Sequence, residues 1–173
     1  MLYEIVPFFS LIGIMTLFLL ISGTFEVTEV NLDDIRRQLT DLNYKADKMR
    51  IVTVEAMDDE MLESSTKAEG ECFYNSYMNV IYGRGERYVL GYRCEEKVID
   101  HAIIRKGDKY YDPTLQVEGN FTSYQYAILT EFTVFDMMTH AKSNKDFPPD
   151  IAYLLKKANK FKNVIDTDKL NKK

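Results

Sequence analysis

The chain has 173 residues, enough for one domain with its own hydrophobic core. Its formal net charge of −5 argues against a nucleic-acid binder, which would carry a basic face. Two cysteines and two histidines are too few for a disulfide framework or a structural zinc site, so we expect no metal and no cofactor.

A long apolar segment opens the chain. Residues 5–23 are nineteen positions without a charge, about enough for a helix to cross a bilayer. We therefore expect residues 1–24 to be a membrane anchor. A cleaved signal peptide, with small residues at Ser22 and Gly23, is the alternative and would give a secreted protein. A short N-terminus and an acidic flank favour an exported, periplasmic or extracytoplasmic body, whereas Arg36 and Arg37 favour a cytoplasmic one.

Apolar residues recur at steps of three and four between residues 32 and 49, after the good N-cap residue Asn31. One interpretation is a coiled coil that makes a homodimer through residues 32–49. The other is an amphipathic helix that packs on its own domain. We assign residues 25–50 to this membrane-proximal helix and residues 51–173 to the domain that follows. The stripe consists of Leu32, Ile35, Leu39, Leu42, Ala46 and Met49.

The segments outside the central motif give coarser predictions. Ile51–Val54 resembles a strand, Ala56–Thr66 an acidic helix, and Tyr124–Ala141 either a helix or a strand. Pro148 and Pro149 open a last helix from Asp150 to about Lys162, with a buried stripe of Ile151, Leu154, Leu155 and Ala158. His140 has no partner pattern, and we expect it on the surface or at a helix end.

The stretch from Gly70 to Thr114 carries the candidate chemistry. Residues 71–82 have the apolar spacing of a buried helix, which places Cys72 in its first turn. The backbone N–H groups and the dipole at a helix start stabilise a thiolate, and the thiolate is the nucleophilic form of cysteine. The sequence therefore makes Cys72 a candidate nucleophile.

Three strands are expected after this helix, at residues 87–93, 98–106 and 109–113. If Gly107 and Asp108 alone form the turn of the second hairpin, Lys106 pairs with Lys109 and position 103 pairs with Asp112. His101, two residues from position 103, then lies on the same face as Asp112 and diagonally across from it. A three-residue turn would put them on opposite faces.

These positions suggest an acyl-transfer mechanism. Cys72 would attack an acyl carbon, His101 would take and return its proton, and Asp112 would orient the imidazole. A helix-start N–H, such as that of Cys72 itself, would stabilise the oxyanion, and the side chains of Tyr74 and Asn75 are further candidate donors. Asp112 has an alternative role as a cap of the turn at Pro113.

The order of these motifs resembles the transglutaminase-like core of the papain-like cysteine peptidase superfamily. The matching residues are Gly70-Glu71-Cys72, His101-Ala102 and Asp112-Pro113-Thr114, within a motif core of residues 70–114. The resemblance implies an α+β domain, with the nucleophile on a helix packed against a small antiparallel sheet. It also implies a peptide or protein substrate and chemistry that is hydrolysis, deamidation or transamidation of an amide bond.

Two alternatives remain open. In an exported domain, Cys72 and Cys94 could form a disulfide, which would block the nucleophile. The second hypothesis is a catalytically inactive binding or inhibitor module on the same fold, which would act on a membrane or envelope protein. The state of the Cys72 thiol distinguishes the enzyme from the binding module.

Overall fold

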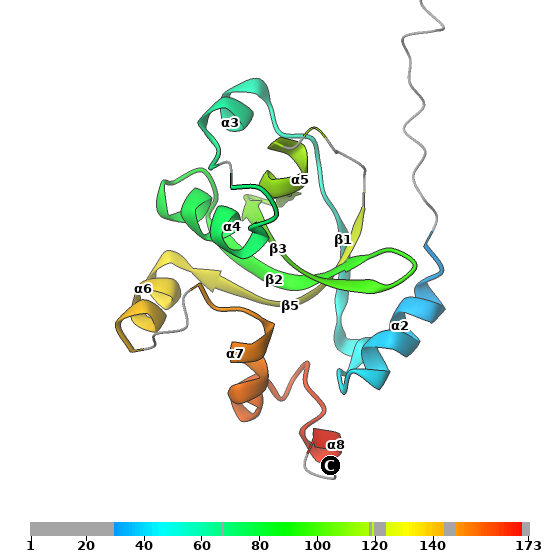
Figure 1. Ribbon diagram of the computed structural model, residues 1–173. Coiled ribbons are helices and arrows are strands. Elements are labelled where there is room, and N and C mark those ends of the chain that lie inside the picture. The colour runs from blue at the N-terminus through cyan, green and yellow to red at the C-terminus, as the bar shows by residue number, and fades with distance from the viewer. Residues whose placement is uncertain (1–29, 67, 118, 120–123, 144–147, 171–173) are drawn as a thin grey trace, which may run out of the picture.

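Five antiparallel strands form one curled sheet in the order β1-β5-β2-β3-β4 (Figure 1). The computed structural model describes residues 30–66, 68–117, 119, 124–143 and 148–170. The expected α+β class is confirmed for these residues. The strands are β1 (Arg50–Thr53), β2 (Arg87–Cys94), β3 (Val98–Lys106), β4 (Lys109–Tyr111) and β5 (Gln125–Thr133).

The first 29 residues lie outside the described part of the chain, and the predicted membrane segment at residues 5–23 lies among them. Within the residues that the structure describes, no helix is both long and apolar enough to cross a bilayer. Membrane anchoring therefore stays a prediction.

The three predicted strands are present as β2, β3 and β4 and form a meander, but β4 ends at Tyr111 and not at residue 113, because a helix begins at Pro113. Lys106 pairs with Lys109, so the turn consists of Gly107 and Asp108 alone. Gly107 has a φ of 59°, which suits the first central position of a two-residue hairpin turn and which glycine adopts without steric strain. The even-numbered turn fixes which side chains of β3 share a face with the residues that follow β4.

The sheet curls around a small inner core. A bulge in β5 opposite Leu90 and Gly91 bends the strand pair, and the chain after β1 reaches β4, where the Glu55 N–H donates to the Tyr110 carbonyl at 2.8 Å. The curled face thereby encloses a cluster of apolar side chains, with Val52 and Tyr124 packed against it. This inner core consists of Val54, Val89, Ile103, Tyr110, Tyr126 and Ile128.

Helix α4 (Cys72–Ile81) packs against β3. The Ser76 hydroxyl donates to the Ala102 carbonyl at 2.8 Å, which ties the helix to the strand. Helix α5 (Pro113–Val117) follows β4 and packs against α4. The helix predicted at residues 71–82 is thus confirmed, and Cys72 is its first residue.

Helix α2 (Leu32–Asp41) is shorter than the predicted stripe. It begins after the predicted cap Asn31 but ends before Asn43, whose φ of 66° breaks the helix, and a 3₁₀ turn at Ala46–Lys48 follows. Ile35 and Leu39 are buried in the same core as the strands, as the single-domain interpretation predicts. A continuous helix to Met49 is wrong, and the homodimer through residues 32–49 stays a prediction.

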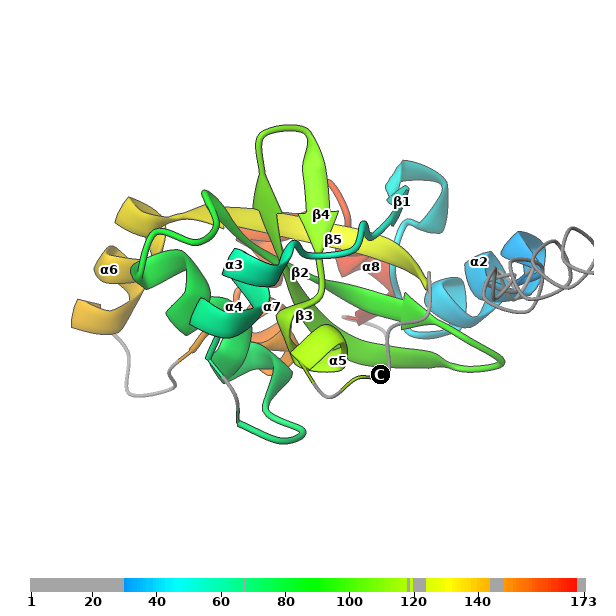
Figure 2. The same cartoon turned by 90° about the horizontal axis from the view of Figure 1, so that it is seen from above.

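The remaining helices surround the sheet, with α2 and α6 at its opposite ends (Figures 1 and 2). The segment predicted as helix or strand contains both, since β5 runs directly into α6. His140 lies in the last turn of α6, as expected for a helix end, but it is buried against the Tyr153 ring and not on the surface. These helices are α3 (Asp59–Ser64), α6 (Val134–Ser143), α7 (Ile151–Lys156) and α8 (Thr167–Leu170).

The last helix is shorter than predicted. Helix α7 begins at the expected N-cap Asp150, but it ends at Lys156 and continues as a 3₁₀ turn at Ala158–Phe161. Ile151 and Leu154 are buried as predicted, whereas Leu155 is exposed. The change of helix type after Lys156 ends the regular spacing on which the longer stripe depended.

Candidate active site

His101 and Asp112 are hydrogen-bonded partners across the β3–β4 hairpin. Ile104 pairs with Tyr111, which places Asp112 one residue beyond β4 and on the face of His101. The His101 Nε2 and Asp112 Oδ2 atoms are 2.7 Å apart. Both side chains are buried, His101 at 5% exposure and Asp112 at 1%. The diagonal contact predicted from the parity of the turn is therefore present.

Asp112 also caps α5, so the two roles considered for it occur together. Its Oδ1 atom accepts hydrogen bonds from the backbone N–H groups of Thr114 and Leu115, each at 3.0 Å. This is the arrangement of an N-cap carboxylate. Each oxygen has a separate task, and α5 fixes the direction in which the carboxylate presents Oδ2 to His101.

Cys72 meets His101 from the start of α4. Its thiol acts on the imidazole and contributes to raising the pKa of His101. Because Nε2 of His101 is engaged by Asp112, Nδ1 is the nitrogen left to accept the proton of the thiol. The Cys72 side chain is buried, at 8% exposure. The structure thus brings together all three residues of the predicted triad, from α4, β3 and the end of β4.

The charges in this cluster favour a protonated imidazole beside an ionised carboxylate. Burial lowers the pKa of His101, but its hydrogen bonds to Asp112 and Cys72 outweigh burial and raise that pKa to about 9. Burial raises the pKa of Asp112, but the bonds from His101 and Tyr126 outweigh it and hold the pKa below its ordinary value of 3.8. Cys72 therefore faces a positively charged partner.

The N-terminus of α4 differs from that of its neighbours. Helices α2, α3 and α7 begin with side-chain caps from Asn31, Asp58 and Asp150. For α4, Glu71 makes no side-chain cap bond. The first N–H groups of a helix have no partner within the helix. At Cys72 they are positioned to stabilise negative charge on the thiolate sulfur or on an oxyanion.

The two side chains proposed as oxyanion donors have other surroundings. Asn75 is 1% exposed. Its side-chain amide forms hydrogen bonds with the N–H and the carbonyl of Ala68 and with the Thr114 hydroxyl. It joins the preceding loop and α5 to α4. Tyr74 is 41% exposed and lies about 200° around the helix from Cys72. Neither side chain is directed at the acyl site, which leaves the backbone N–H of the first turn as the better candidate.

In the structure both cysteines are free thiols, with Cys72 at the start of α4 and Cys94 in β2. Cys94 lies in β2, fully buried in the main core, and its sulfur is 3.7 Å from the Tyr92 carbonyl oxygen. Burial raises the pKa of Cys94 to about 11, even though a backbone hydrogen bond from Ala127 lowers it. Cys94 is therefore an inert core thiol, in contrast to Cys72.

Tyr126 is a member of the cluster that the sequence did not indicate. Its hydroxyl donates to Asp112 Oδ2 at 2.6 Å, and its ring lies 5.7 Å from the His101 ring, centroid to centroid. Burial and the neighbouring Asp112 raise the pKa of Tyr126 strongly, so it remains a neutral donor. No local pattern points to Tyr126, because it reaches the site through the pairing of β5 with β2.

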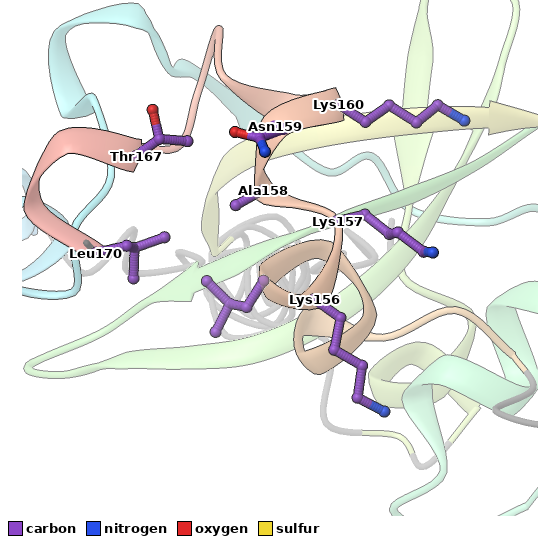
Figure 3. Close-up of a pocket in the computed structure, with 8 residues that line it drawn as sticks. Lys156, Lys157, Ala158, Asn159, Lys160, Thr167 and Leu170 are labelled. Carbon is purple, nitrogen blue, oxygen red and sulfur yellow. The ribbon is translucent and has the colours of Figure 1, made fainter. Parts of the chain in front are cut away.

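The described residues contain no group of three or more His, Cys, Asp or Glu side chains that could hold a metal ion. A pocket of about 520 Å³ lies at the C-terminal helices (Figure 3). None of the predicted site residues lines it, and the side chains of Lys156, Lys157 and Lys160 extend outward without converging on a common point.

Cys72, His101 and Asp112 thus form one buried cluster in the described part of the chain. No protein-family model, no curated protein and no solved structure matches this chain.

Proposed function

We propose that this protein is a thiol-dependent enzyme that acts on a peptide or amide bond, as a cysteine hydrolase or acyltransferase. The observation that carries the proposal is the buried His101–Asp112 hydrogen bond, with Cys72 beside the same imidazole at the start of α4. The resemblance of its three motifs to transglutaminase-like enzymes supports the same reaction class.

The reaction follows from the positions of the three side chains. The Cys72 sulfur attacks the carbonyl carbon and forms a tetrahedral oxyanion, while His101 holds the thiol proton. The N–H groups at the start of α4 stabilise the oxyanion. When the C–N bond breaks, the proton passes from His101 to the leaving amine, and a thioester remains on Cys72. Water then releases an acid, or a second amine releases a new amide, and either restores the thiol.

The proposal includes an anchor at residues 5–23, which would hold the domain at a membrane with its body on the extracytoplasmic side. A peptide or protein of the cell envelope is the substrate class that fits such a location. In the presence of an added amine, the labelled product divides between the acid formed with water and the amide formed with the amine. The ratio of the two decides between hydrolysis and transamidation.

Alkylation of the full chain with iodoacetamide tests the proposal, with mass spectrometry to quantify modification at each cysteine. At about pH 6 we expect Cys72 to react about 10-fold or more faster than free cysteine, because an adjacent histidine at a helix start activates a cysteine as a nucleophile. Cys94 is the internal reference, since its buried thiol should remain unmodified.

Two histidine variants sharpen this test. His101→Gln should remove the excess reactivity of Cys72. His140→Gln, a change to the other buried histidine, should leave it intact, since His140 lies in α6 against Tyr153. If Cys72 in the wild-type protein reacts no faster than free cysteine, the enzyme hypothesis fails, and the inactive binding module becomes the preferred interpretation.

A further inference from the structure

Asp112 Oδ2 accepts two hydrogen bonds, one from each side of the site. His101 Nε2 lies at 2.7 Å and the Tyr126 hydroxyl at 2.6 Å from the same oxygen. Together with the two N–H bonds to Oδ1, four donors surround a carboxylate that is almost completely buried. An ionised carboxylate in such a place needs hydrogen-bond donors to offset the loss of water.

The sheet is built so that Tyr126 can reach Asp112. Tyr126 lies in β5, and β2 separates β5 from β3. The residue of β2 that pairs with His101 is Gly91, so no side chain stands between the imidazole and the Tyr126 ring on this face. The curl of the sheet then brings the Tyr126 hydroxyl over β2 to Asp112. The contact is a long-range one that depends on both the bulge and the glycine.

We propose that Tyr126 is a positioning residue, whose hydroxyl fixes Asp112 in the single orientation that holds His101 for reaction with Cys72. The inference rests on the proposed function. It assigns to Tyr126 a role that a core tyrosine with a merely structural hydrogen bond would not have.

The expected signature is a change in the low-pH behaviour of the site. The charged and titratable groups around Asp112 are His101 from β3, Cys72 beyond it from α4, and Tyr126 from β5, with N–H dipoles from α5. Arg93 and Tyr124 act on Tyr126 itself. Each donor helps to keep the pKa of Asp112 low. Loss of the Tyr126 hydroxyl should therefore raise the pKa of Asp112. As the pH is lowered, Cys72 should then lose its reactivity at a higher pH than in the wild type.

The experiment is the pH profile of Cys72 alkylation in the full chain with Tyr126→Phe, compared with the wild type. We expect the acid limb of the profile to move upward by about one pH unit, a tenfold change in proton affinity, with a lower rate on the plateau. The matched control is Tyr92→Phe, which removes another buried hydroxyl, one that donates to the Tyr44 hydroxyl at 3.1 Å. This control should leave the acid limb unchanged.

An unchanged acid limb in Tyr126→Phe, with only a lower midpoint of thermal unfolding, would overturn the inference and leave the proposed function intact. A second readout is independent of Cys72 reactivity. In the wild type, with labelled histidine and tyrosine, the NMR signals of His101 and Tyr126 should shift together at the same low pH, and independent shifts would overturn the inference. Joint shifts with an unreactive Cys72 would show that Tyr126 and His101 are coupled through Asp112, but would refute the enzyme and with it the positioning role. This measurement also applies if Tyr126→Phe fails to fold.

Discussion

Asp112 holds His101 with only one of its two oxygens, because the other oxygen begins α5. Asp112→Asn should therefore separate the two tasks. The oxygen of the new amide accepts the hydrogen bonds from the N–H groups of α5, so the amide presents its NH₂ group to His101 Nε2. The imidazole must then carry its proton on Nδ1, where it cannot accept one from Cys72. We expect Cys72 alkylation to slow by about 100-fold or more.

Asp112→Ala is the companion variant, because it also removes the cap. It should be less stable than Asp112→Asn by about 1 kcal/mol in urea unfolding, the usual contribution of an N-cap side chain. It also leaves the buried Tyr126 hydroxyl without its acceptor. Equal stability of the two variants would contradict the assignment of Oδ1 as the cap of α5.

The His101–Asp112 pair also predicts how stability depends on pH. The pKa of His101 rises from 6.5 to about 9 on folding, since the bonds to Asp112 and Cys72 outweigh the effect of burial. Its contribution to the free energy of unfolding is thus complete below about pH 6.5 and is lost as the pH rises through about 9. The pKa of Asp112 is lowered, so its contribution is present above 3.8 and is lost as the pH falls below that value.

Urea unfolding of the wild type and of His101→Gln at several pH values measures this contribution. The difference in the free energy of unfolding between the two proteins should be largest near about pH 6 and should shrink by a few kcal/mol by about pH 10. Each tenfold change in proton affinity corresponds to about 1.4 kcal/mol. A difference that stays constant over this range would show that the imidazolium does not stabilise the fold.

Gly91 predicts a stability effect at the bulge. A Cβ atom at this position would lie 2.3 Å from the Ala127 carbonyl oxygen, which belongs to the backbone of the paired strand. Gly91→Ala should therefore destabilise the protein by about 3 kcal/mol, as overpacking does where the neighbour cannot move. Because Gly91 pairs with His101, Cys72 reactivity should fall as well.

Gly83→Ala is the control for this glycine. Gly83 has a φ of 76°, but a Cβ atom added there would have nothing within 4 Å, so only the backbone conformation is penalised, by about 1–2 kcal/mol. Chemical denaturation of both variants compares the two effects. A Gly91→Ala protein as stable as Gly83→Ala would mean that β5 shifts to accommodate the methyl group.

The parts of the site that the sequence predicted depend on local signals. The helix at Cys72 follows from apolar spacing after a glycine, and the His101–Asp112 contact follows from a two-residue turn within eleven positions of chain. Neither prediction depends on how the other strands of the sheet pair. The fold class could be predicted for the same reason, since the meander and the helix before it form its centre.

The parts that the sequence missed depend on distant contacts. Tyr126 reaches Asp112 only because β5 pairs with β2 and is bulged there, and neither feature has a local sequence signal. Helix α2 ends at Asp41 although its apolar spacing continues, because Asn43 adopts a positive φ and Tyr44 then pairs with Ile165 near the end of the chain. The role of Asn75 depends on Ala68 in the preceding loop and on Thr114 in α5.

Ser76 gives the last prediction, which concerns how α4 is held against β3. Its hydroxyl donates to the Ala102 carbonyl at 2.8 Å, and Ala102 directly follows His101. Ser76→Ala leaves that buried carbonyl without its donor, so we expect a loss of about 1–3 kcal/mol in the free energy of unfolding. Ser143→Ala, which removes an exposed hydroxyl that donates to Thr139 within α6, should stay within about 0.5 kcal/mol of the wild type.

Ser76→Ala should also reduce the reactivity of Cys72, because Ser76 lies four residues after Cys72 in α4 and therefore on the same face of the helix. A helix that shifts at Ser76 carries Cys72 away from His101, and a misplacement of about 1 Å is enough to slow a positioned reaction about 100-fold. Alkylation of Ser76→Ala measures this loss. If stability falls while the alkylation rate at Cys72 is unchanged, the contact stabilises the domain without setting the distance between Cys72 and His101.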